Sequence, residues 1–242
     1  MVMKKNIAIV GGSSDIAIAT VNHISKEKYN FFALIREQDK SSELSELDVD
    51  VTIGDATSEE DIKNFVTSVK DSGEIHGVLH SVGSFAVRPP HAMNKEAFES
   101  VISTNLTSAF LTLSIAGKAM LSQGHGRMVF MSSVAGSLGL VNHEAISAAK
   151  GGVESMVRSA AATYANRGIR INAVAPGLTD TKLASPIMSN ETASQAASQK
   201  IPIKRVNEKD CLLYTSPSPR DQRGSRLTSS ACKKKGGGGG GG

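Results

Sequence analysis

Runs of aliphatic and β-branched residues alternate along this chain with longer segments in which apolar residues recur at helical spacing. The short runs predict six strands: NIAIV (6–10), FFALI (31–35), VDVTI (49–53), GVLHSV (77–82), GRMVFMS (126–132) and RINAVAP (170–176). The longer segments predict helices over 15–26, 59–72, 95–123 and 143–166. Each gap is long enough for a right-handed crossover, and no repeat or linker interrupts the pattern. We therefore predict a single α/β domain with a doubly wound, Rossmann-like parallel sheet.

The composition changes abruptly at Cys211. The sequence CLLYTSPSPRD (211–221) resembles a translated sequencing-library adapter, and the chain closes with KKK and seven glycines. A flexible tail rich in Ser, Pro and Arg is the alternative. We expect residues 1–210 to form the domain, truncated at its C-terminus near Asp210, and residues 211–242 to be a non-native, disordered tail.

Charge and cysteine content take on a different meaning once residues 211–242 are set aside. Residues 211–242 hold six of the 27 Lys and Arg residues and one of the 23 Asp and Glu residues, so residues 1–210 carry a net charge of about −1. This balance gives no reason to expect a nucleic-acid or membrane partner. Both cysteines lie after residue 210, so we predict no disulfide and no metal site. The first apolar run is too short for a signal peptide, and we expect a cytoplasmic enzyme.

A glycine-rich turn, VGGSSDIA (10–17), joins the first predicted strand to the first helix. In a dinucleotide site, such glycines let backbone N–H groups approach the pyrophosphate at the positive end of the helix dipole. A plain strand-to-helix turn is the alternative for this motif taken alone.

Further motifs follow in a fixed order: GDATSEED (54–61), HSVG (80–83), STNLTSAF (103–110), MSSVAG (131–136) and INAVAPGLTDT (171–181). With these motifs, the chain from Lys4 to Asp210 resembles the short-chain dehydrogenase/reductase family. The resemblance implies hydride transfer between a nicotinamide cofactor and a carbonyl or alcohol substrate. It also implies that the natural chain continues into a last helix and strand, which this chain lacks.

The resemblance assigns roles to individual residues. It implies a cofactor site made by Gly11, Ser13, Ser14, Asp15, Ile16, Arg36, Asp55, Ala56, Gly83, Lys150, Pro176, Gly177, Thr179 and Thr181. Asp55 stands where the family binds the adenine amino group. It implies a catalytic set of Asn105, which anchors a water in the proton relay, Ser133, which polarises the carbonyl, and Lys150, which holds the nicotinamide ribose.

The catalytic tyrosine of the family is absent. In VNHEAISAAK (141–150), the position thirteen after Ser133 and four before Lys150 is Ile146, which cannot transfer a proton. Losing a general acid costs on the order of 10²- to 10⁴-fold in rate. His143 is a candidate substitute acid, although His143 and Glu144 fit an exposed loop or first helical turn equally well. Tyr164 is interpreted as a packing residue.

Two further positions depart from the family pattern. Asp15 replaces the middle glycine of the turn, where it would cap the helix or, if it faced the pyrophosphate, repel it. His80 replaces an asparagine, and we interpret it as a strand-end residue with a satisfied ring.

Cofactor preference is indicated at the end of the second strand. The place where NAD enzymes carry an acid falls on Ile35, and Arg36 follows it. A guanidinium there fits a 2′-phosphate, so the sequence favours NADP over NAD, with a solvated arginine as the alternative.

The remaining features concern partners. The helices predicted over 95–123 and 143–166 correspond to those that form the dimer interface in the family, so the resemblance implies a homodimer or homotetramer. The alternative is that their apolar faces pack only in the core of one subunit. Residues 178–200 correspond to the lid over the substrate, with Lys182 and Lys200 within it. The sequence thus supports an NADP(H)-dependent oxidoreductase of a small-molecule carbonyl or alcohol, with an altered or missing acid. A catalytically silent nucleotide-binding or partner-binding subunit is the second hypothesis.

Overall fold

The computed structural model describes residues 4–189, 195, 199 and 206–208. The tail predicted over 211–242, the expected loss of the last helix and strand, and Lys200 lie outside these residues. The strands, helices and contacts of the fold are those of the described residues.

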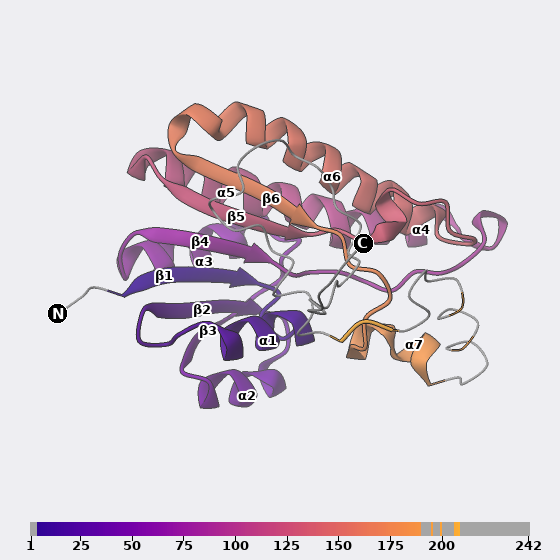
Figure 1. The fold of residues 1–242 in the computed structure, drawn as a ribbon, viewed down its shortest axis with the longest axis horizontal. Coiled ribbons are helices and arrows are strands. Elements are labelled where there is room, and N and C mark those ends of the chain that lie inside the picture. Colours follow the sequence, from indigo (N-terminus) through magenta and orange to yellow (C-terminus); the bar gives the residue numbers. More distant parts are fainter. Residues whose placement is uncertain (1–3, 190–194, 196–198, 200–205, 209–242) are drawn as a thin grey trace, which may run out of the picture.

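Six parallel strands form one sheet in the order β3-β2-β1-β4-β5-β6 (Figure 1). The strands are β1 (Lys5–Val10), β2 (Tyr29–Ile35), β3 (Val49–Ile53), β4 (Ile75–His80), β5 (Gly126–Met131) and β6 (Ile169–Val174). All six predicted strands are present, and the doubly wound α/β prediction is confirmed. The chain order reverses between β1 and β4, so the loops that follow these two strands diverge and leave a crevice.

The helices are α1 (Asp15–His23), α2 (Ser41–Glu46), α3 (Glu59–Asp71), α4 (Lys95–Ile102), α5 (Ser108–Gln123), α6 (Glu144–Tyr164) and α7 (Ser185–Met188). The prediction of helix over 15–26 runs three residues too far, because the chain turns extended at Ile24. The prediction misses α2 and α7, which are too short to show a helical period.

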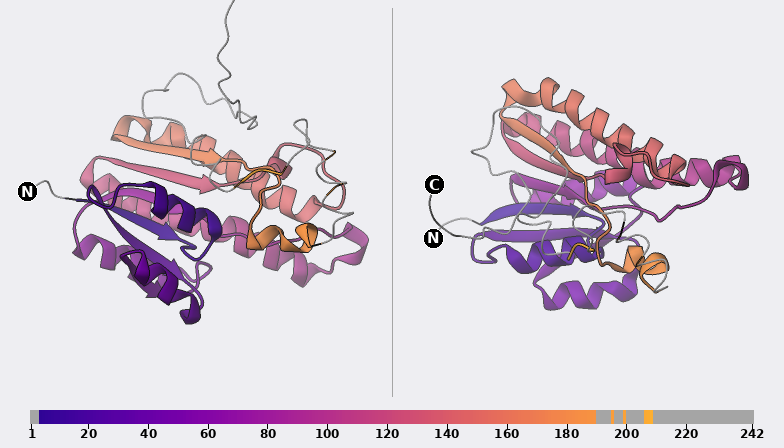
Figure 2. Two further views of the ribbon diagram at one scale, coloured as in Figure 1. Left: turned by 60° about the horizontal axis from the view of Figure 1, so that its bottom comes forward. Right: turned by 45° about the vertical axis from the view of Figure 1, so that its right-hand side comes forward.

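Helices cover both faces of the sheet (Figures 1 and 2). On one face α3, α5 and α6 bury a large cluster around Phe65, Met120 and Phe130, and Tyr164 packs against it as predicted. On the other face α1 and α2 bury a smaller cluster that includes Val21 and Leu44. Apolar burial of this kind is the main stabilising term of such a sheet.

The stretch predicted as one helix over 95–123 is continuous but not uniform. Residues Ser103–Thr107 form a π-helical turn between α4 and α5. By length and composition alone, Lys95–Gln123 is apolar enough to cross a membrane. Ala109, Ala116 and Met120 are nevertheless buried in the core, and this packing accounts for the apolar composition of α5.

Candidate functional site

A cavity of about 1430 Å³ opens where the six strands end. It is lined by residues that follow each strand, such as Gly11 after β1, Arg36 after β2 and Asp55 after β3. Every residue that the sequence assigns to catalysis or cofactor binding contributes to this lining: Gly11, Ser13, Ser14, Asp15, Ile16, Arg36, Asp55, Ala56, Gly83, Asn105, Ser133, His143, Ile146, Lys150, Pro176, Gly177, Thr179 and Thr181. The structure therefore brings the whole predicted set together, and the individual roles remain predictions.

The glycine-rich turn sits tightly against the loop after β4. Gly11 has a φ of +84°, and a Cβ there would lie 2.9 Å from the backbone of Ser81. Any other residue at this position would be strained and would clash. The Ser14 and Ser81 hydroxyls are 2.7 Å apart and hydrogen bonded, which ties the turn to the end of β4 across the crevice.

Ser14, and not Asp15, caps helix α1. The Ser14 side chain accepts a hydrogen bond from Ala17 N at 3.2 Å, whereas Asp15 is the first helical residue. The interpretation of Asp15 as the cap is therefore wrong. Its Oδ2 instead accepts a hydrogen bond from Lys182 N at 2.6 Å. The carboxylate thus holds the start of the segment predicted as a lid, 167 positions along the chain.

Asp55 is prepared as a hydrogen-bond acceptor. Its Oδ1 accepts hydrogen bonds from the backbone N–H and the hydroxyl of Thr57, at 2.7 and 2.8 Å. The backbone bond from Thr57, more than any other contact, lowers the pKa of the Asp55 carboxyl. Its own N–H donates to Asp61 Oδ2 at 2.7 Å. The carboxylate is thus kept ionised beside the cavity, where it could accept from an amino group.

The end of β2 carries a small charge cluster that the sequence analysis missed in part. Arg36 donates to Glu37 at 3.3 Å, and Lys40 pairs with the same carboxylate at 2.7 Å. The hydrogen bond from Lys40, followed by that from Arg36, lowers the pKa of Glu37. All three residues line the cavity. Two cations therefore lie at this end of the cavity, and both pair with one anion.

The π-helical turn aims Asn105 at the loop after β4. Its side chain is fully buried, donates to Ser84 Oγ at 2.8 Å and to Val101 O at 2.9 Å, and accepts from Ser84 N at 3.2 Å. Single π-helical turns of this type occur often at functional sites, because they rotate one side chain out of the helical register. Ser84 was not singled out in the sequence, since its contact spans 21 positions.

Ser133 begins a 3-10 turn, Val134–Gly136, that lies on α6. Its Oγ accepts a hydrogen bond from Ala135 N at 3.2 Å, so the hydroxyl hydrogen is left to donate elsewhere. A Cβ on Gly136 would lie 3.0 Å from the backbone of α6 at Lys150 and Gly151, so a glycine favours this close approach. The turn therefore fixes the position of Ser133 relative to α6.

Glu154 binds the chain on both sides of Ser133. Its carboxylate, which is 3% exposed, accepts hydrogen bonds from the Ser132 and Ser137 hydroxyls, each at 2.9 Å. The sequence offered no signal for this role, because the helical period alone marks Glu154 only as a residue on an apolar face. We regard Glu154 as a positioning residue for the Ser133 turn.

Lys150 is buried beneath the cavity floor. Its Nζ donates to Met131 O at 2.9 Å and to Val82 O at 3.5 Å. Burial lowers its pKa from 10.5 to about 8, because a low-dielectric environment disfavours the ammonium. The group is still mainly protonated at neutral pH. A Cβ on Gly83 would lie 3.7 Å from this Nζ, so Gly83 is a direct neighbour of the ammonium at the cavity wall.

Ile146 lies one helical turn before Lys150 and also reaches the cavity. It is 8% exposed and packs with Val101, Ala135, Ala145 and Ala149. His143 lines the same cavity, and its Nδ1 donates to Val141 O at 2.7 Å, which makes Nε2 the ring nitrogen that carries the lone pair in the neutral ring. The cavity therefore keeps the Ser133 hydroxyl and the Lys150 ammonium, and Ile146 adds an apolar side chain to the same lining.

His80 is only partly satisfied, contrary to the interpretation from the sequence. Its Nε2 lies 3.0 Å from Ser108 Oγ, which itself donates to Thr104 O, so the ring nitrogen must be the donor. Within the described part of the chain, Nδ1 is buried with no partner. Desolvation, and then the charge of Lys150, lowers the pKa of His80 to about 3. The ring is therefore neutral and cannot serve as an acid.

Comparison with known proteins identifies the family. The enoyl-(acyl carrier protein) reductase family matches residues 11–212. The 3-oxoacyl-[acyl-carrier-protein] reductase MabA of Mycobacterium bovis is 30% identical over 204 residues, which cover 84% of this chain and 80% of that protein. The chain is a member of the short-chain dehydrogenase/reductase family.

Other relatives of this reductase family agree. Levodione reductase of Leifsonia aquatica is 31% identical over 218 residues, covering 84% of this chain and 82% of the relative. Among solved structures, a variant of actinorhodin polyketide ketoreductase with NADPH superposes with a TM-score of 0.83 at 25% identity, covering 88% of this chain and 90% of that one. The predicted resemblance is confirmed, and homologues of this kind act on carbonyl or alcohol substrates with a nicotinamide cofactor.

Proposed function

We propose that this protein is an NADP(H)-dependent oxidoreductase that interconverts a carbonyl and an alcohol by hydride transfer, with an altered general acid. The observation that carries the proposal is the convergence of Asn105, Ser133 and Lys150 on one cavity, next to the glycine-rich turn. A cytoplasmic location, expected from the sequence, is part of the same proposal.

The residues present fit a dinucleotide. The turn at Gly11 and the N-terminus of α1 would hold the pyrophosphate, Asp55 the adenine, and Lys150 the nicotinamide ribose. Residues after β6, from Pro176 to Thr181, would contact the nicotinamide end. When bound, the nicotinamide supplies or accepts the hydride. Asp15 is compatible with this arrangement because its carboxylate is engaged by Lys182 N.

Ser133 and Lys150 would stabilise charge on the substrate oxygen. The Ser133 hydroxyl hydrogen can donate to a carbonyl, since in its bond with Ala135 N the Oγ is the acceptor. The buried ammonium of Lys150 adds positive charge in a poorly solvated site, where it acts strongly on a developing alkoxide. These two groups form a partial oxyanion site.

Proton transfer is the step in which this site differs from the mechanism usual in the family. Ile146 cannot protonate the alkoxide, so the proton would come from another side chain at the cavity wall or from water. His143 is the candidate on this chain, because its Nε2 is not used by the hydrogen bond to Val141 O. His143→Ala should then alter the pH–rate profile of carbonyl reduction, and an unchanged profile would exclude the histidine from the role.

NADP is proposed over NAD because two cations, Arg36 and Lys40, lie at the ribose end of the cavity. A 2′-phosphate could take the place of Glu37 as their partner, since guanidinium and ammonium groups bind phosphate oxygens well. Glu37 opposes this preference, because a carboxylate at the same place could accept from a ribose hydroxyl.

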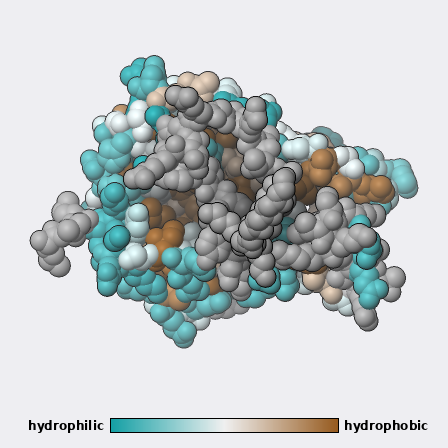
Figure 3. Space-filling model, in the orientation of Figure 1, coloured by the Kyte–Doolittle hydropathy of each residue, from teal (hydrophilic) through white to brown (hydrophobic). Residues whose placement is uncertain are grey.

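The substrate is proposed to be apolar around its carbonyl. Five large hydrophobic residues that line the cavity are exposed: Phe85, Val87, Leu138, Val141 and Leu183. Figure 3 shows hydrophobic surface at the right-hand end of the molecule, where α4 and the start of α6 lie in Figure 1. Exposed apolar groups at a site mouth favour a ligand that removes them from water.

A homodimer or homotetramer is proposed as the assembled form. Members of the family usually form oligomers, and α5 carries two exposed hydrophobic residues, Phe110 and Leu121. A surface of this kind is favourable to bury between two copies of the chain.

A catalytically silent subunit that binds nucleotide is the second candidate function, and Ile146 is the observation that favours it. Titration with NADPH and NADH, followed by fluorescence, measures binding, and a panel of ketones then tests oxidation of the reduced cofactor. Turnover of any ketone supports the oxidoreductase. Tight binding with no turnover across the panel would support the silent subunit instead.

A further inference from the structure

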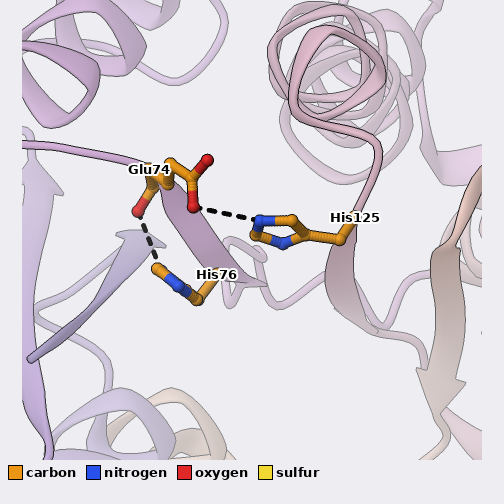
Figure 4. Close-up of side chains that lie close together, drawn as sticks. All are labelled: Glu74, His76 and His125. Atoms are coloured by element: carbon orange, nitrogen blue, oxygen red, sulfur yellow. Dashed lines mark hydrogen bonds and ion pairs between the residues drawn. The ribbon is translucent and has the colours of Figure 1, made fainter.

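Three potential metal ligands meet at the opposite edge of the sheet from the cavity. Glu74 immediately precedes β4, His76 lies near its start, and His125 immediately precedes β5 (Figure 4). One ligand atom from each lies within 4.8 Å of the others. The length of β4 separates this cluster from the cavity by about 20 Å, at roughly 3.3 Å a residue.

The backbone around the cluster is held by side-chain hydrogen bonds. Gln123, the last residue of α5, accepts from Ile75 N at 2.9 Å and donates to Ile75 O at 3.0 Å. The β4–β5 register begins with Gly77 paired to Arg127, so His76 and His125 lie one and two positions before these paired residues. Glu74, His76 and His125 therefore lie together where two neighbouring strands begin.

His76 has the tautomer that many metal-binding histidines have. Its Nδ1 lies 2.9 Å from Glu74 O, and because a carbonyl can only accept, Nδ1 carries the proton. The lone pair is then on Nε2. Histidines that bind metals commonly donate their other ring N–H to a carbonyl, which orients the ring and selects the tautomer.

His125 and Glu74 are already spaced as two ligands of one ion. Their Nε2 and Oε2 atoms are 3.1 Å apart. Two ligands at about 2.0–2.1 Å from a tetrahedral centre are roughly 3.4 Å apart. An ion could therefore replace the proton between these two atoms with little movement. The His76 and His125 rings, with centroids 5.3 Å apart, flank the same space.

We propose that Glu74, His76 and His125 bind a divalent transition-metal ion, with Zn²⁺ the preferred species. Two imidazoles and one carboxylate favour such an ion over Mg²⁺ or Ca²⁺, which take oxygen ligands. Three protein ligands leave one position for water in a tetrahedral site. The bound ion would link the turn before β4 to the turn before β5. This site differs from the sequence prediction of no metal, and it does not depend on the proposed function.

The test is calorimetric titration of the folded protein with ZnCl₂. Cys211 and Cys232 could also bind this ion, so the titration uses C211S/C232S as the parent protein. We expect saturable binding of one ion per chain. His125→Asn and His76→Gln should each weaken it by at least about tenfold, since even indirect partners of a metal ligand can contribute that much. His91→Gln, at another exposed histidine, is the matched control and should bind as the parent does.

Cobalt provides a second measurement. Co²⁺ bound by the parent should give visible absorption bands of a four-coordinate site, which Zn²⁺ removes and excess Mg²⁺ does not. Circular dichroism in metal-free buffer confirms that the variants fold. If the two histidine variants fold and bind Zn²⁺ as tightly as the parent, or if the parent binds none, the proposed site is wrong.

Discussion

At the scale of single residues, Ile146 matches its apolar surroundings, whereas Lys150 is a charged group in a buried place. Ile146 fits its apolar cluster and contributes packing, but it removes the ionisable group that the family places there. Lys150 is kept as a charged group in a buried site, held by two backbone carbonyls. Ile146 therefore contributes to stability but cannot transfer a proton. Lys150 keeps an ionisable group in the site, and its burial costs some stability.

Ile146→Tyr tests whether the remaining residues are arranged for carbonyl reduction. A phenol beside Lys150 should restore a general acid and raise the rate on a simple ketone by on the order of 10²- to 10⁴-fold. NADPH oxidation followed by absorbance measures the gain. Ile146→Phe adds the same ring without the hydroxyl and should give no gain. An equal rate in both variants, with cofactor bound, would contradict the proposal.

Arg36 and Glu37 test the cofactor preference in opposite directions. Arg36→Ala should weaken NADPH binding by about 1.5 kcal/mol, the lower end for a charge-assisted bond, because the side chain is 73% exposed. NADH binding should change little. Glu37→Gln should favour NADPH further, since it removes a negative charge near the phosphate. Fluorescence titration with both cofactors gives the ratio, and equal losses in Arg36→Ala would show that Arg36 does not recognise the phosphate.

The pKa of Lys150 predicts a pH effect on stability. Between about pH 8 and 10.5 the folded chain has lost the proton that the unfolded chain still binds, so stability rises with pH across this window. Relative to Lys150→Met, the parent should gain about 2 kcal/mol of unfolding free energy between pH 7 and 9.5. Urea unfolding of both proteins at both pH values measures this difference. A difference that stays constant with pH would mean that Lys150 titrates normally.

At the scale of elements, the site is built from contacts between segments distant in the chain. Helix α6 supplies Glu154, which fixes the turn after β5, while the start of α1 supplies Asp15, which fixes the segment after β6. The π-helical turn between α4 and α5 adds Asn105. Each element therefore contributes one polar anchor to the loops at the carboxyl ends of the strands.

Glu154→Ala should disturb the Ser133 turn without touching the cavity. The Ser137 hydroxyl would lose its acceptor and the Ser132 hydroxyl would keep only Lys150 O, at 3.2 Å, so unfolding should become easier by about 2 to 4 kcal/mol. Glu154→Gln keeps the shape and one acceptor oxygen, and it should cost less than about 1 kcal/mol. With Ile146→Tyr as the active background, kcat should fall in the alanine variant and recover in the glutamine variant while the NADPH Kd stays constant. Parallel loss of cofactor affinity would indicate a general structural effect.

At the scale of the whole molecule, two hydrophobic cores hold the sheet and the site lies at its carboxyl edge. The cores do not include the outer faces of α4 and α5, where Phe98 and Phe110 are 41% and 56% exposed. An apolar surface on these helices is consistent with the oligomeric forms usual in the family.

Phe110→Glu tests the assembly. If α5 forms the interface between subunits, a buried carboxylate there should separate the oligomer into smaller species. Size-exclusion chromatography with light scattering measures the mass, and circular dichroism checks the fold. Ile53→Glu changes another exposed hydrophobic residue, on edge strand β3, and should leave the mass unchanged. An unaltered mass in Phe110→Glu would place the interface elsewhere or show a monomer.

The sequence by itself determined the six strands, the main helices, the family and the substitution at residue 146. These features depend on local periodicity and on the spacing of motifs, which are properties of neighbouring residues. The position of Ile146 follows from counting between Ser133 and Lys150, and tertiary structure does not alter that count.

Only the tertiary structure decided which polar groups meet. Asp15 contacts Lys182, Ser14 contacts Ser81, and Glu154 contacts Ser132, although 167, 67 and 22 positions separate these pairs. The chain reverses direction between strands, so such contacts depend on packing distances and on the register between strands. Hydrophobic periodicity along the sequence reports neither of these. For the same reason, the sequence interpretation left Asp15 either as a cap or as a charge facing the pyrophosphate, and it treated His80 as satisfied. A hydrogen-bond partner distant in sequence becomes a neighbour only when the sheet has formed.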